Sequence, residues 1–104
     1  MAQESLLLEL LGAQPLTRVV DYLLEKRPYD ASKQEIIRET GVSRNTFFRI
    51  WDRIERFGLV KPTRTIGRAT LYVLDDANPV VERLRDLEFT LIKASMEPKK
   101  KLHT

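Results

Sequence analysis

The segment 35–60, EIIRETGVSRNTFFRIWDRIERFGLV, contains two helical patterns separated by a single glycine, Gly41. Its second part repeats apolar residues at the spacing of a helix with one buried face, at Phe47, Ile50, Trp51 and Ile54. Two helices joined by so tight a break predict a helix-turn-helix. The second helix of that motif fits the major groove of DNA, so the segment constrains both the fold and the function.

The sequence around this segment also predicts where its helices begin and end. Ser32 is a suitable N-cap for a helix over 33–40, and Glu35, three residues later, would complete a capping box. Gly41 supplies the positive φ at which helices commonly end. Ser43 then caps a second helix, which we expect to run to about Phe57.

Two further helices are expected before this motif. The run 5–11, SLLLELL, begins a short apolar helix that Gly12 and Pro15 end. Thr17 is an acceptable N-cap for a helix over 18–26, which Pro28 stops.

After Gly58 the periodicity changes from helical to extended. The runs 60–65 and 70–74 are rich in β-prone residues, and residues 66–69 between them place Gly67 at a hairpin bend. Pro62 restricts the first of these strands to an edge position. Asn78 and Pro79 form an N-cap and first-turn pair that begins a last helix over 79–96.

This order of elements predicts a mainly α protein with a small β-hairpin, a winged helix-turn-helix with extra N- and C-terminal helices. We expect one domain over 1–98 and a flexible basic tail over 99–104. The run TGVSRNTFFRIWDRIERFGLVKPTRTIGRATLYVL resembles the winged-helix domains of small archaeal transcription regulators of the MarR and ArsR superfamily. Its GVSRNT turn, FGLV exit and TRTIGRATLYVL wing carry the resemblance, which covers 15–96. The resemblance implies a sequence-specific, DNA-binding transcription regulator.

The charge distribution agrees with an anionic partner. Residues 31–70 hold nine lysines and arginines against four acidic residues, a net charge of +5, although the whole chain is only +3. The segments 1–30 and 71–98 together hold six basic and eleven acidic residues. A basic middle between acidic flanks is expected when one face meets phosphates.

Composition argues against several other classes of protein. The chain has no cysteine, and its single histidine, His103, is in the terminal tail. Thiolate metal sites and the usual catalytic dyads are therefore excluded, whereas a carboxylate site is not. No nucleophile–base pair or phosphate-cradling loop is present, so we expect neither an enzyme nor a cofactor. No apolar run spans a membrane and no signal peptide is recognisable, so we expect a cytoplasmic protein.

The outer face of the second motif helix contains residues that we expect to contact DNA, and its first turn would lie deepest in the groove. Arg44 and Asn45 can make bidentate contacts to guanine and adenine, respectively. Thr46, Arg49 and Arg53 would contact a base or the adjacent backbone. Ser32, Lys33 and Ser43 at the two helix starts would position phosphates. The remaining residue, Phe48, either contacts thymine methyls or the sugar backbone, or packs against the wing.

Three cations in the hairpin are also expected to contact DNA. Arg64 and Arg68 flank the bend at Gly67, and Lys61 is at its base. An arginine at a hairpin tip can enter the minor groove or bind a phosphate. The alternative is that these charges only protect an exposed strand edge.

The chain ends carry more leucine than a small winged domain readily buries. We expect a homodimer built from 5–11 and 79–96, with an interface at Leu7, Leu8, Leu11, Leu84, Leu87 and Leu91. Such a dimer would read a palindromic double-stranded site. The alternatives are that both helices pack on their own core, that the protein acts in replication or partition, or that it is a protein-interaction subunit.

Overall fold

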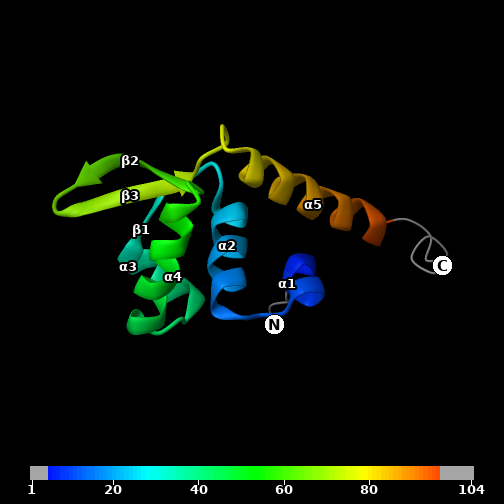
Figure 1. Ribbon diagram of the computed structural model, residues 1–104, viewed down its shortest axis with the longest axis horizontal. Coiled ribbons are helices and arrows are strands. Elements are labelled where there is room, and N and C mark those ends of the chain that lie inside the picture. Colours follow the sequence, from blue (N-terminus) through cyan, green and yellow to red (C-terminus); the bar gives the residue numbers. More distant parts are fainter. Residues whose placement is uncertain (1–4, 97–104) are drawn as a thin grey trace.

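The computed structural model describes residues 5–96 and has five helices and a small antiparallel sheet in this range (Figure 1). The helices are α1 (Leu6–Leu11), α2 (Pro15–Lys26), α3 (Lys33–Thr40), α4 (Arg44–Arg56) and α5 (Pro79–Ser95). The strands are β1 (Ala31–Ser32), β2 (Val60–Ile66) and β3 (Ala69–Leu74), in the order β1-β3-β2. The predicted tail 99–104 lies outside the described residues.

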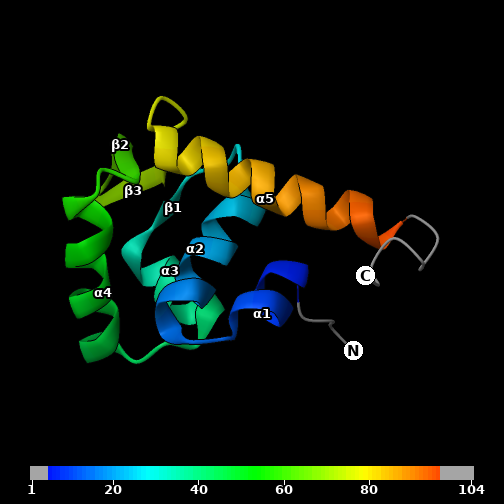
Figure 2. The same cartoon turned by 45° about the vertical axis from the view of Figure 1, so that its right-hand side comes forward.

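Helices α2, α3 and α4 form the body of the molecule. The β2–β3 hairpin extends from one side of this body, and α5 extends from the other (Figures 1 and 2). Helix α1 packs against both α2 and α5. The molecule is therefore elongated, measuring 51 × 29 × 23 Å.

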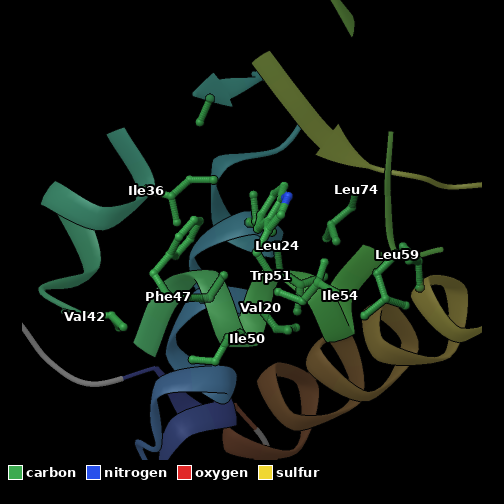
Figure 3. Packing of buried hydrophobic residues seen from close by; sticks show 14 of the residues in the cluster. Val20, Leu24, Ile36, Val42, Phe47, Ile50, Trp51, Ile54, Leu59 and Leu74 are labelled. Carbon is green, nitrogen blue, oxygen red and sulfur yellow. The ribbon is translucent and has the colours of Figure 1, made fainter. Parts of the chain in front are cut away.

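The core gathers around the inner face of α4 (Figure 3). Phe47 and Trp51 stack with ring centroids 5.3 Å apart, and Tyr72 of β3 meets Trp51 edge-on. All four apolar positions predicted from the helical spacing are buried, as are Ile36 of α3 and Leu74 of β3. Burial of these aromatic rings fixes which face of α4 remains outside.

Local capping explains most of the helix boundaries. The Ser32 and Ser43 hydroxyls accept hydrogen bonds from the backbone N–H groups of Glu35 and Thr46, as predicted. Gly41 has a φ of 73° and its N–H donates to the Ile37 carbonyl. The second half of the predicted capping box is absent, because the Glu35 carboxylate accepts from Lys26 at 3.0 Å instead.

The start of α2 and the length of the hairpin turn differ from the predictions. Helix α2 begins at Pro15 with Gln14 as its N-cap, three residues before the predicted start, because Pro15 occupies the first helical turn where its missing N–H costs nothing. The hairpin turn has only Gly67 and Arg68 between the paired residues Ile66 and Ala69. Gly67 has a φ of 61°, and a glycine first in a two-residue turn matches the twist of the flanking strands.

The sheet contains two features that the sequence did not predict. The two-residue strand β1 pairs with β3, so β3 is central and β2, with Pro62, is an edge strand as expected. A bulge in β2 shifts the register between Pro62 and Arg64. The Thr63 hydroxyl at this bulge donates to the Leu71 carbonyl at 3.3 Å.

Candidate nucleic-acid interface

The outer face of α4 carries most of the predicted contact residues. Arg44, Asn45, Arg49 and Arg53 are exposed, and Thr46 is half-buried. The Arg49 Nη2 donates to the Thr46 hydroxyl at 3.4 Å. Among residues 5–96, the side chains of Asn45 and Arg53 have no hydrogen-bond or ion-pair partner. These polar groups are therefore available to an external ligand.

On one flank of α4, a hollow of about 270 Å³ separates the helix from the hairpin. We call it the wing-side hollow; its lining residues are Ser32, Lys33, Gln34, Phe48, Arg68, Ala69, Thr70 and Tyr72. The Lys33 ammonium lies 5.6–5.8 Å from the ring centroids of Phe48, Trp51 and Tyr72. Aromatic faces attract a cation at this distance, so the rings orient Lys33 at the start of α3.

Arg44 extends over the same flank. Its guanidinium carbon is 5.5 Å from the Phe48 ring centroid, and its Nη1 donates to the Gln34 Oε1 at 3.2 Å. The guanidinium is therefore oriented by two neighbours while remaining exposed, which lowers the entropy cost of holding it against a ligand.

The other flank of α4 faces the start of α2. Thr46, Arg49 and Arg53 line a hollow there together with Gln14 and Pro15. Two arginines thus lie beside the N-terminal turn of α2, where backbone N–H groups attract anions. Exposed cations therefore lie on the hairpin and on α4, and two of those on α4 border the start of α2.

The three hairpin cations differ in their surroundings. Lys61 and Arg68 are exposed and, within the described part of the chain, have no ion-pair partner. Arg64 instead binds Asp30, with Nε–Oδ2 and Nη2–Oδ1 distances of 3.0 and 3.1 Å. Hydrogen bonds from Arg64 and then Thr63 hold the pKa of the Asp30 carboxyl below its usual value. Arg64 therefore fastens β2 to the loop before β1 and is less available than Arg68.

The predicted dimer residues are divided between core and surface. Leu7 is 2% exposed within the protomer's own core, so its predicted place in an interface is corrected. Leu84, Leu87 and Leu91 are partly buried against the same core, and Leu8 is half-buried. The heptad-like seam of α5 thus serves the protomer's own packing.

Other apolar residues are exposed at this end of the molecule. Leu10 and Leu11 on α1, Phe89 and Ile92 on α5, and Met96 after α5 are each at least 43% exposed. An apolar hollow of about 240 Å³ opens beside Leu11 and Phe57. The apolar surface available to a partner is therefore adjacent to, and distinct from, the predicted seam.

Helices α2 and α5 also bring three carboxylates together, which we call the acidic cluster: Asp21, Glu25 and Glu88. Their oxygens lie within 4.8 Å of one another, the single group of possible metal ligands in the range 5–96. Asp21 is buried and its Oδ1 accepts from the Ser5 hydroxyl at 2.7 Å. Burial, followed by repulsion from its neighbours, raises the pKa of both Glu25 and Glu88.

Several residues of the interface were not predicted from the sequence. Gln34 supports Arg44, and Asp30 fixes Arg64, through contacts between residues far apart in the chain. Thr70 and Tyr72 line the wing-side hollow because alternate residues of β3 face α4. The period-two alternation of β3 was the one available signal for these two residues.

The three-helix body, its helix-turn-helix and the three-stranded antiparallel sheet define a winged helix-turn-helix fold. The crystal structure of the transcriptional regulator PA3341 is similar, with a TM-score of 0.59 and 20% sequence identity. The match covers 91% of this chain and 73% of that chain. Neither a protein-family model nor a curated protein sequence matches the chain. In the described range, no helix is both long and apolar enough to cross a membrane.

Proposed function

We propose that this protein is a sequence-specific double-stranded DNA-binding transcription regulator. The observation that carries the proposal is the set of cations on the outer face of α4, beside the start of α2 and at the tip of the hairpin. These three elements converge on two hollows that flank α4. A protein-interaction domain would have no need of this surface, whereas phosphates on both sides of a groove match it. The fold that the chain shares with the regulator PA3341 supports the same function.

In the proposed complex, α4 lies in the major groove. Its first turn enters most deeply, so Arg44 and Asn45 contact base edges. Arg49, Arg53 and Lys33 contact the phosphates on either side, and Arg68 at the hairpin tip contacts the adjacent backbone or minor groove. Ser32 and Ser43 act mainly as helix caps, because their hydroxyls already accept backbone hydrogen bonds.

The protein is further proposed to act as a homodimer. The exposed apolar side chains of α1 and α5, among them Leu10, Phe89 and Ile92, would be covered by a second copy. A two-fold dimer presents two recognition helices about 34 Å apart, one turn of DNA. The operator would then be a palindrome.

The test is a pair of alanine substitutions in the first turn of α4. Arg44→Ala and Asn45→Ala each remove a bidentate base contact, which should cost about 1–3 kcal/mol of discrimination per contact. Binding of wild type and double variant to the preferred duplex and to a scrambled duplex is measured by fluorescence anisotropy. Unchanged discrimination in the double variant would contradict the placement of α4 in the groove.

The matched control is Arg38→Ala. Arg38 is an exposed arginine at the end of α3 and lines neither hollow beside α4. This variant should keep the preference between the two duplexes, because it removes a cation without removing a base contact.

A further inference from the structure

We propose that Phe48 determines part of the sequence specificity by contacting the 5-methyl group of a thymine next to the base pair that Arg44 reads. This inference rests on the proposed function and names a base that the α4 surface selects. It follows from the position of one aromatic ring, which the core does not use.

Phe48 lies outside the core although it adjoins a core residue. Phe47 is fully buried, whereas Phe48 is 44% exposed and meets Phe47 only edge-on, with ring centroids 5.4 Å apart. The part of the ring that the protomer leaves uncovered stays in contact with solvent. Its apolar surface is therefore available to a ligand.

Packing against the hairpin does not account for Phe48. Phe48 lines the wing-side hollow, about 270 Å³ in volume, together with Arg68 and Thr70 of the hairpin, so space remains open on this side of the ring. A ring that served to attach the hairpin would close this space with van der Waals contacts. The hairpin is instead attached through Tyr72 on Trp51 and through Arg64 on Asp30.

The surroundings of Phe48 direct it toward a nucleic acid. The Arg44 guanidinium is 5.5 Å from the Phe48 ring centroid, and the Lys33 ammonium is 5.8 Å from it. Phe48 also follows Arg44 by four residues, so the two side chains are adjacent on one face of α4. An apolar ring between the exposed Arg44 and the half-buried Lys33 fits a ligand that presents an apolar group beside anions.

Major-groove chemistry limits what that apolar group can be. Every base pair presents hydrogen-bond donors and acceptors there, and the thymine 5-methyl is the apolar group among them. Arg44 prefers a guanine, whose O6 and N7 accept both arms of its guanidinium. The pair Arg44 and Phe48 therefore selects a thymine adjacent to, or one step from, a guanine.

The experiment removes the methyl group from the DNA and the ring from the protein. Each thymine of the preferred half-site is replaced in turn by deoxyuridine, which lacks only the 5-methyl. Affinities are measured for wild type, Phe48→Ala and Phe48→Leu. We expect one position at which deoxyuridine lowers the affinity of wild type about three- to fivefold, because the contact then lacks one buried methyl group. Phe48→Ala should be insensitive at that position, whereas Phe48→Leu, still apolar, should keep much of the effect.

Tyr29→Ala is the matched control, because Tyr29 is a 72% exposed aromatic residue in the loop before β1 and lies outside the wing-side hollow. It should keep the full deoxyuridine effect. Two results would overturn the inference. In the first, no deoxyuridine substitution changes the affinity of wild type. In the second, Phe48→Ala lowers the affinity for all duplexes equally, which indicates a backbone contact. A wild-type protein with no preference among duplexes would instead overturn the proposed function itself.

Discussion

The hairpin end and the α5 end of the molecule each contain a group of like charges, but in different surroundings. At the hairpin end, arginines and lysines point into solvent, and Arg49, Arg53 and Arg68 have no ion-pair partner among residues 5–96. At the α5 end, the carboxylates of the acidic cluster converge between two packed helices, and burial raises the pKa of each. Like charges in solvent cost little folding energy and remain available to an anion. The repulsion between like charges that are buried between helices is relieved when one of the groups is protonated.

The largest expected difference between the two ends is in DNA affinity. Arg49→Glu should lower affinity on the order of 10- to 100-fold, because it replaces a cation beside the phosphates with an anion. Arg83→Glu makes the same change in net charge on α5 and should alter affinity by less than about twofold at moderate salt. Anisotropy titrations at one salt concentration measure both. Equal losses would mean that net charge, and not the α4 surface, determines binding.

A second difference concerns self-association. Phe89→Lys places a charge in the exposed apolar surface of α5 and should weaken a dimer by about 2 kcal/mol or more, the effect of losing a central aromatic contact. Sedimentation should then show monomers at concentrations where wild type is dimeric. Tyr29→Lys changes an aromatic residue that is 72% exposed in the loop before β1 and should leave the dimer intact. A Phe89→Lys variant that sediments like wild type would contradict the proposed interface.

The smallest expected effect is a change in stability with pH at the α5 end. The folded state raises the pKa of Glu88 above its usual 4.5, so it binds the proton more tightly than the unfolded chain does. Protonation of Glu88 therefore increases the free energy of unfolding as the pH falls from neutral through the raised pKa. The increase is complete below the pKa that Glu88 has in the unfolded chain. Glu88→Gln removes the repulsion and should stabilise the protein at neutral pH by up to about 1 kcal/mol.

Urea unfolding at several pH values tests this prediction. As the pH falls, the free energy of unfolding of wild type should increase relative to that of Glu88→Gln. Glu55→Gln, an exposed carboxyl on the outer side of α4, serves as the control and should track wild type. If Glu88→Gln is less stable than wild type at neutral pH, the carboxylates of the acidic cluster do not repel one another.

Local features of the fold were predictable from the sequence. The caps at Ser32, Ser43 and Asn78 and the positive φ of Gly41 were confirmed, because each depends on residues within one helical turn. The burial of Trp51 was confirmed too, since its spacing from Phe47 and Ile54 fixes it on the inner face of α4. The cations of this helix were predicted to be exposed for the same reason.

Features that depend on distant residues were not predictable. Strand β1 is two residues long and exists because β3 pairs with it. Leu7 and the α5 seam were assigned to a dimer because the sequence does not show that α1 packs between α2 and α5. Likewise, nothing local to Arg64 indicates that Asp30 would bind it. In each case the partner lies at least a helix away along the chain.

The central claim is that the surface over α4 reads a DNA sequence. Selection of bound duplexes from random DNA, at two salt concentrations, tests it most directly. A dimer that reads sequence should enrich one palindromic sequence at both concentrations, with guanine and thymine in each half-site and an affinity that falls as salt rises. Recovery of unrelated sequences at both concentrations would contradict the claim and leave a phosphate-binding protein without sequence preference.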